Sequence, residues 1–164
     1  MAIDKDTFKA VMGSWPSGVT VVTSAVGDER LGLTASAFSS VSLEPPLVLV
    51  CIKKGNPAGD LIKRAEHFAV SVLSTEQVFW GERFAGFHKD VEDRFEGLDY
   101  VTKETGSPIL PDARAYADCK LFAVYDGGDH DIMVGEVLDG AADGTSPVLY
   151  YDRAWRGVGD PVGS

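Results

Sequence analysis

Short runs of β-branched and apolar residues, separated by turns rich in glycine, proline and aspartate, constrain the fold of this chain more than any other feature. They occupy residues 18–26, 31–38, 47–52, 68–73, 115–125, 131–138 and 148–151. Runs of this length and composition are typical of strands, and their close spacing favours hairpins over the helical crossovers of a parallel sheet. We therefore predict a mainly β fold in which six or seven antiparallel strands form one barrel.

Two or three short helices are expected beside these strands. A first helix begins where Asp4 or Asp6 can cap it, and the apolar spacing predicts two more at residues 58–65 and 76–84. Residues 86–111 are instead polar and rich in Gly, Pro and charge. They predict a long surface loop, and loops of this length often form lids or dimer contacts.

The chain of 164 residues carries 25 acidic against 15 basic residues, a net charge of −10. This balance argues against nucleic acid and anionic membranes as partners, and a phosphorylated ligand would need a local patch of N–H, hydroxyl and cationic groups. The N-terminus lacks the apolar core of a signal peptide, and the longest apolar run, residues 47–52, is too short to span a bilayer. We expect a soluble, cytoplasmic protein with a single domain over residues 1–164.

The sequence offers no metal site and no familiar nucleotide or hydrolase motif. Cys51 and Cys119 each lie in an apolar run, which favours reduced core thiols over a bridge or a redox pair. No Cys/His cluster has metal-ligand spacing, so no bound metal is expected. The dinucleotide fingerprint, the phosphate-binding P-loop and the serine-hydrolase elbow are all absent.

The segment at residues 34–47 is the most unusual one, with five hydroxyl residues in its first nine positions. These side chains could hydrogen-bond their own backbone in a surface strand and turn. They could also form a pocket wall, in which small residues let backbone N–H groups approach a planar ring and hydroxyls solvate a phosphate. Lys53 and Asn56 follow one strand later, beside a helix start; they are either solvated or hold a phosphate.

Three further candidates have two interpretations each. Arg83 ends a predicted helix, where its positive charge either interacts with the negative end of the helix dipole or binds a phosphate. His130, in a glycine-rich turn, is either solvated or acts as an orienting group or proton donor beside a bound ring. The aromatic residues Tyr151 and Trp155 serve packing, or offer a stacking surface to a nicotinamide or purine. No Ser or Cys is evidently paired with His130.

Several segments, taken in order, resemble the short-chain flavin reductase family, which supplies reduced flavin to two-component monooxygenases. They are Pro-Ser-Gly-Val-Thr-Val-Val-Thr at 16–23, the segment 34–47, Phe-Ala-Val-Ser-Val-Leu at 68–73, Gly-Asp-His at 128–130 and Gly-Glu-Val at 135–137. The resemblance runs from about residue 8 to residue 157. It implies an FMN-binding split β-barrel of Greek-key type that forms a homodimer, with FMN or FAD at the subunit interface.

The resemblance also implies which residues form the site. The serine-rich segment would contact the isoalloxazine and ribityl chain, residues 51–53 and 56–57 the next wall, and residues 83–84 the phosphate. His130 would lie near the nicotinamide, with Tyr151 and Trp155 in the same pocket. The implied flavin-binding residues are Thr34, Ala35, Ser36, Ser39, Ser40, Ser42, Leu43, Cys51, Ile52, Lys53, Asn56, Pro57, Arg83 and Phe84.

The implied activity is hydride transfer from NADH or NADPH to FMN or FAD, with the reduced flavin passed to a separate monooxygenase. Since the flavin carries the redox chemistry, His130 is the one catalytic side chain predicted and no nucleophile is needed. Many family members have Gly-x-Tyr after the last aromatic strand, where this chain has Arg-Ala-Trp at 153–155. Two alternatives stay open: an oxidase of the pyridoxamine-phosphate-oxidase type that uses FMN, and a non-catalytic barrel for a small ligand.

Overall fold

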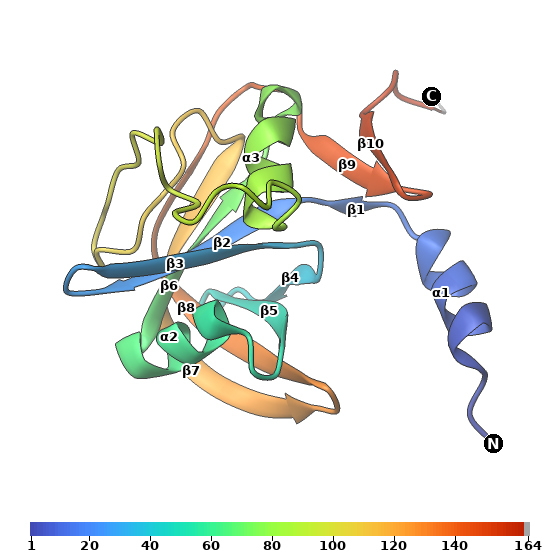
Figure 1. The fold of residues 1–164 in the computed structure, drawn as a ribbon, viewed down its shortest axis with the longest axis horizontal. Helices are drawn as coiled ribbons and strands as arrows, with labels where there is room; N and C mark the ends of the chain where they lie inside the picture. Colours follow the sequence, from blue (N-terminus) through green and yellow to red (C-terminus); the bar gives the residue numbers. More distant parts are fainter. Residues whose placement is uncertain (163–164) are drawn as a thin grey trace.

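The computed structural model describes residues 1–162 and has a seven-stranded antiparallel sheet at its centre, in the order β3-β2-β6-β7-β8-β5-β4 (Figure 1). The last two residues of the expected domain lie outside the described part. The strands of this sheet are β2 Thr20–Val26, β3 Glu29–Ala35, β4 Phe38–Ser42, β5 Leu47–Lys53, β6 His67–Val72, β7 Ala115–Gly127 and β8 His130–Ala142. The mainly β fold and its antiparallel pairing are as the sequence predicts.

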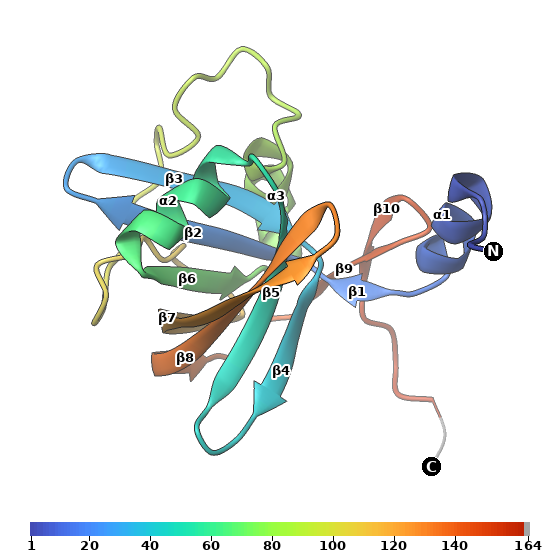
Figure 2. The same cartoon turned by 90° about the horizontal axis from the view of Figure 1, so that it is seen from below.

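A second, three-stranded sheet and three α-helices complete the structure. The small sheet has the order β1-β9-β10, and Figure 2 shows it with α1 to one side of the main sheet. The helix α1 buries none of its residues. The remaining elements are α1 Lys5–Gly13, α2 Pro57–Ala65, α3 Val78–Phe84, the 3-10 turn Thr75–Gln77, β1 Ser17–Gly18, β9 Val148–Tyr151 and β10 Ala154–Gly157.

The barrel is split because the strands at the two ends of the main sheet do not pair with each other along residues 1–162. The chain leaves β3 after Ala35 and starts β4 at Phe38. Between them the carbonyl of Ala37 accepts a hydrogen bond from the N–H of Cys51 on β5. The run at residues 31–38, predicted as one strand, is therefore two strands in different parts of the sheet.

The central strands β2 and β6 are buried on both faces. Inside the barrel, Val22 and Val70 pack with Phe68, Met133 and Ile62 of α2. On the other face, Val21 and Leu73 pack against α3 and the loop at residues 86–111. Both strands are rich in valine, and the polar residues among them, such as Thr23 and Ser71, are buried too.

Buried polar side chains fasten the 86–111 loop to this outer face. The hydroxyl of Thr23 donates to the carbonyl of Pro108, and Ser71 Oγ accepts from the N–H of Leu110 at 3.0 Å. The fully buried carboxylate of Asp118 accepts from the N–H of Thr105 at 2.8 Å and from its hydroxyl. The loop has little regular structure, as predicted, but it is a fixed outer layer of the fold.

The hydroxyl of Ser107 extends this polar cluster to His67. Ser107 Oγ lies 2.9 Å from Thr105 Oγ1, and His67 Nδ1 is hydrogen-bonded to Ser107 Oγ at 2.7 Å. Burial lowers the pKa of His67, while the charge of Asp118 acts in the opposite direction. The two cysteines are free; Cys119 is buried in the core, as predicted, whereas Cys51 is only half-buried and does not belong to the core. Burial raises the pKa of the Cys119 thiol to about 12. No helix within residues 1–162 is long and apolar enough to cross a membrane.

Replacing Gly135 with alanine should destabilise the fold by about 1–3 kcal/mol, because a Cβ there would lie 2.5 Å from Cζ of the buried Phe68 ring. Gly144 is the matched control, since a Cβ at that position meets nothing within 4 Å. Urea unfolding of both variants measures the difference. A Gly135→Ala protein as stable as Gly144→Ala would contradict the packing described for β8.

Stability should fall as the pH drops below about 6.5, the usual pKa of a histidine. Because the folded pKa of His67 is lowered, the unfolded chain takes up the proton first and is favoured as the pH falls. The variant His67→Gln keeps a hydrogen-bonding group without this titration, so its stability should change less between pH 7 and about pH 5. Urea unfolding across this range, with an NMR titration of the ring, measures both; equal slopes would contradict the prediction.

Candidate functional site

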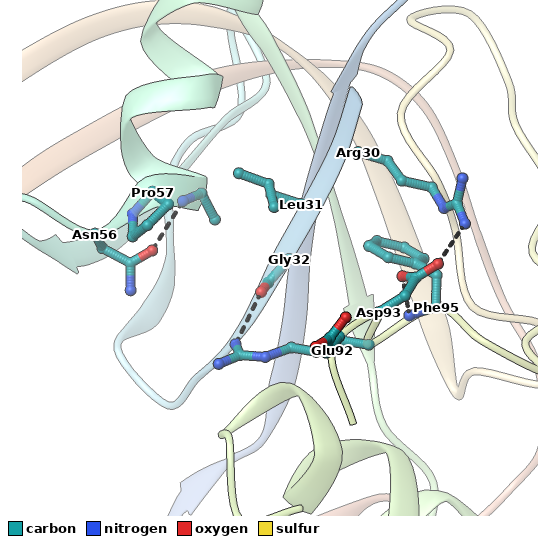
Figure 3. Close-up of a pocket in the computed structure, with 10 residues that line it drawn as sticks. Arg30, Leu31, Gly32, Asn56, Pro57, Glu92, Asp93 and Phe95 are labelled. Carbon is teal, nitrogen blue, oxygen red and sulfur yellow. Dashed lines mark hydrogen bonds and ion pairs between the residues drawn. The ribbon is translucent and has the colours of Figure 1, made fainter. Parts of the chain in front are cut away.

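A cleft of about 500 Å³ opens where β3, the start of α2 and the 86–111 loop meet (Figure 3). Figure 3 shows Asn56 and Pro57 on one side of the β3 backbone, and Arg30 with Asp93 on the other. The residues that line the cleft are Arg30, Leu31, Gly32, Asn56, Pro57, Ala58, Glu92, Asp93, Arg94 and Phe95. The cleft thus combines two of the predicted flavin-binding residues with a charged loop.

The start of α2 forms one wall because the chain reverses tightly after β5. Gly55 has φ 77°, a conformation that favours glycine, and Pro57 takes the first helical position. Asn56 caps the helix, its Oδ1 accepting from the N–H of Ala58 at 2.9 Å. The positive end of the helix dipole therefore faces the cleft, where it favours an anion.

Arg30 and Arg94 supply the positive charge of the cleft. Arg30 Nη2 donates to Asp93 Oδ2 at 2.8 Å, and its guanidinium lies over the rings of Phe95 and Tyr100, at 5.4 and 5.8 Å from their centroids. Its Nε is buried and has no partner within residues 1–162. Such an orphaned donor, with a second arginine nearby in a chain of net charge −10, suits a phosphorylated ligand.

The second arginine is bonded to neutral groups alone. Arg94 Nη1 donates to the carbonyl of Phe84 at 2.7 Å and to that of Gly32 at 3.3 Å. The described part of the chain places no carboxylate in an ion pair with it. Its charge is therefore less compensated than that of Arg30.

The outer face of β5 adjoins the cleft and holds other predicted residues. Val50 and Ile52 are buried in the barrel, so the alternation of a strand turns Cys51 and Lys53 to the opposite face. The register pairs Lys53 with His130 on β8. The carbonyl of Lys53 accepts from the N–H of Asn56 at 3.1 Å, which joins this face to the cleft.

His130 is oriented by its neighbour in the turn between β7 and β8. Its Nδ1 lies 2.8 Å from Asp129 Oδ1, and its side chain is 41% exposed. The hydrogen bond and the charge of His130 lower the pKa of Asp129. Since Nδ1 is engaged, Nε2 is the ring atom left to face a ligand.

The start of the serine-rich segment faces α1. Ser36 and Ser39 line a groove of about 320 Å³ together with Met12 and Trp15. Ser36 also lines an adjoining hollow with Tyr151. Ser40 and Leu43 are exposed and Ser42 is half-buried, so this segment lies along the edge of the sheet.

The remaining predicted residues have structural contacts in this chain. Ala35 is buried in the barrel core, and Thr34 Oγ1 donates to the carbonyl of Gly81 at 2.6 Å. Trp155 packs over Gly81 and edge-on to Tyr150. The side chain of Ile52 also faces the core, so only its backbone is available to a ligand.

The pair at the end of α3 lies behind the cleft rather than in it. Arg83 is 8% exposed and donates to the carbonyl of Asp93 at 3.0 Å, with its guanidinium over the ring of Trp80. Phe84 is fully buried, and its ring packs against Gly32. In this chain, Arg83 holds the loop in place and Phe84 supports β3.

Sequence reasoning missed Arg30 and Arg94, the two cations that line the cleft. Arg30 falls between the predicted strands at residues 18–26 and 31–38, Arg94 falls in the polar loop at 86–111, and neither belongs to a motif. Arg30 and its partner Asp93 are 63 residues apart in the sequence. The one signal in the sequence is the net charge of −10, because a phosphorylated ligand would need cations nearby, but this charge does not indicate which cations they are.

Comparison with known proteins identifies the family. The model of the flavin reductase like domain matches residues 12–159. A reductase subunit of a flavin-dependent monooxygenase from Mycobacterium tuberculosis is 36% identical over 95% of this chain and 83% of its own, and a flavin reductase from Pseudomonas putida is 39% identical over 95% and 91%.

A solved structure agrees with this assignment. The NADH:FAD oxidoreductase of Streptomyces globisporus, in complex with NAD and FAD fragments, superposes with a TM-score of 0.89 at 36% identity, over 98% of this chain and 96% of its own. The fold is therefore the split barrel of these enzymes. The chain belongs to the flavin reductase family and is a flavin reductase.

Proposed function

We propose that this protein transfers hydride from NADH to FMN or FAD and passes the reduced flavin to a separate monooxygenase. The observation that carries the proposal is the continuity between two surfaces, the anion-binding cleft at Asn56 and the β5 face with Cys51, Lys53 and His130. A flavin mononucleotide has a phosphate at one end and a planar ring at the other, which matches this pairing. The relative from Mycobacterium tuberculosis, a reductase subunit of a monooxygenase, supports the second half of the proposal.

The side chains bind and orient rather than react. A bound flavin supplies the redox chemistry, accepting hydride and holding two electrons. The cleft holds its phosphate end, and the β5 face with Ser36 and Ser39 holds the ring. His130, held through Nδ1 by Asp129, directs Nε2 to the nicotinamide. Bringing two rings together in a fixed geometry removes much of the entropic cost of the reaction.

A second copy of the chain covers α1 in the proposed assembly. Phe8, Val11, Met12 and Trp15 form an apolar stretch that is about half exposed or more, and α1 buries no residue within its own chain. Contiguous exposed apolar surface of this kind marks an interface. Because Met12 and Trp15 line the groove with Ser36 and Ser39, the second copy would close the flavin site.

The purified protein should bleach the absorbance of added FMN or FAD when NADH is supplied without oxygen. In air it should consume NADH only when flavin is present, because flavin is the hydride acceptor. Consumption should then continue, because oxygen reoxidises the free reduced flavin. Titrating each flavin against NADH and NADPH identifies the preferred pair. If no combination gives flavin binding or nicotinamide consumption, the proposed function is wrong; slow NADH turnover with fast oxidation of an amine substrate would favour the oxidase alternative.

His130→Ala should raise the KM for NADH by about tenfold, the loss of one good hydrogen bond, and leave the dissociation constant of the flavin nearly unchanged. Steady-state kinetics and flavin fluorescence titration measure the two quantities separately. His88→Ala is the control, because this second histidine pairs with Glu82 and lines neither the cleft nor the β5 face. Equal losses of NADH and flavin binding in His130→Ala would contradict the assigned role.

Val11→Glu should convert a dimer into a monomer, because a buried, unpaired carboxylate at an apolar interface is strongly unfavourable. Light scattering coupled to size exclusion gives the mass. The control is Lys5→Glu, which also makes α1 more acidic but at its exposed first residue, which lines neither hollow beside Met12 and Trp15. A wild-type protein that is monomeric at micromolar concentration, with or without flavin, would refute the assembly.

A further inference from the structure

We propose that Lys54 is a positioning residue for His130, because its side chain fixes the turn from which the imidazole projects. The inference rests on the proposed function and deepens it, since it adds a residue to the part of the site that takes the nicotinamide. Lys54 follows the last residue of β5 and precedes the start of α2. Figure 2 shows this connection beside the end of the β7–β8 hairpin, and a backbone hydrogen bond joins the two.

The end of the β7–β8 hairpin has little packing of its own. Residues 124–129 are all exposed, and only Gly128 and Asp129 connect the two strands. A segment with few buried contacts opens locally at a low cost in free energy. Because His130 is the first residue of β8, a movement of this turn would also move the imidazole ring.

Three contacts from Lys54 hold the turn. The N–H of Lys54 donates to the carbonyl of Asp129 at 3.0 Å, and Nζ donates to the carbonyl of Gly128 at 2.6 Å. Nζ also donates to Asp126 Oδ2 at 3.1 Å, while Asp126 Oδ1 accepts from the N–H of Gly128 at 2.8 Å. This N–H and the Lys54 amine lower the pKa of Asp126, so its carboxylate is ionised at neutral pH. The residues directly before His130 are therefore tied to the start of α2.

Asp129 connects the turn to the imidazole. The hydrogen bond and the charge of His130 lower the pKa of Asp129, and the charge of Lys53 adds to this effect. Since an ionised carboxylate can only accept, the 2.8 Å contact with Asp129 Oδ1 places a proton on Nδ1 of His130. In the neutral ring Nε2 is then an acceptor, which suits the carboxamide N–H of a nicotinamide. The direction of Nε2 thus depends on where the turn holds Asp129.

Direct binding of a ligand by Lys54 is the competing interpretation. The side chain is 41% exposed, but its amine already donates to Gly128 and Asp126. Asp126 is 80% exposed, and an ion pair with so exposed a carboxylate contributes little free energy. The bond to the Gly128 carbonyl therefore accounts for most of the expected effect.

The first test measures the KM for NADH, kcat and the dissociation constant of the flavin. Lys54→Met removes the amine but keeps the backbone bond to Asp129. It should raise the KM for NADH by about fivefold, the loss of one ordinary hydrogen bond, with kcat and flavin affinity changed by less than about twofold. Lys54→Arg keeps a donor and should restore most of the loss, and Asp126→Asn should cost less than about twofold. Arg64→Met is the control, because Arg64 pairs with Glu29 and does not line the cleft.

The double variant with His130→Ala separates positioning from direct binding. If Lys54 acts through His130, adding Lys54→Met to His130→Ala should leave the KM for NADH unchanged, because coupled residues are not additive. A further rise of about fivefold in the double variant would overturn the inference, since it would show independent effects. An unchanged KM in Lys54→Met alone, or an equal loss of flavin affinity, would also overturn it.

A measurement without turnover distinguishes this inference from the proposed function. The ¹⁵N NMR shifts of the His130 ring report its tautomer, and Lys54→Met should lower the Nδ1–H population relative to the wild-type protein. An unchanged tautomer in Lys54→Met would overturn the inference. A wild-type protein that neither binds flavin nor consumes NADH refutes the proposed function, whereas the ring shifts still decide whether Lys54 orients His130.

Discussion

Burial of β2 and β6 on both faces is the constraint on which the rest of this structure depends. A barrel core covers one face, so the other needs its own cover, and α3 with the 86–111 loop provides it. An irregular loop serves as a covering layer only if its backbone polar groups are satisfied. Thr23, Ser71 and Asp118 do this from within otherwise apolar strands, which explains why polar residues occur at buried positions there.

The packing of the 86–111 loop on the outer face of the sheet also determines which side chains line the cleft. With the loop held at Pro108 and Leu110, its earlier part crosses the end of α3, where Arg83 donates to the carbonyl of Asp93 and Arg94 donates to that of Phe84. These bonds place Asp93 and Arg94 opposite the start of α2. Arg83 and Arg94 are therefore held in this region by hydrogen bonds to backbone carbonyls.

The sequence predicts the helices and strands better than it predicts which of them come into contact. Local apolar content predicts the strands at residues 47–52 and 68–73, and the Asn-Pro cap predicts the start of α2. Both signals act over a few residues. The break at Ser36 and Ala37 depends instead on whether a strand pairs with β2 or β5, a long-range choice that local composition does not contain. The Arg30–Asp93 pair, 63 residues apart, was unpredictable for the same reason.

An acidic protein that binds an anionic ligand must place its positive groups and hydrogen-bond donors close together at the binding site. With a net charge of −10, long-range electrostatics oppose the approach of a flavin phosphate, and short-range donors must outweigh them. Asp93 lies in the same cleft and pairs with Arg30, which reduces the net positive charge there. Moderate flavin affinity is consistent with the proposed function, because a reductase that hands reduced flavin to another enzyme must release it.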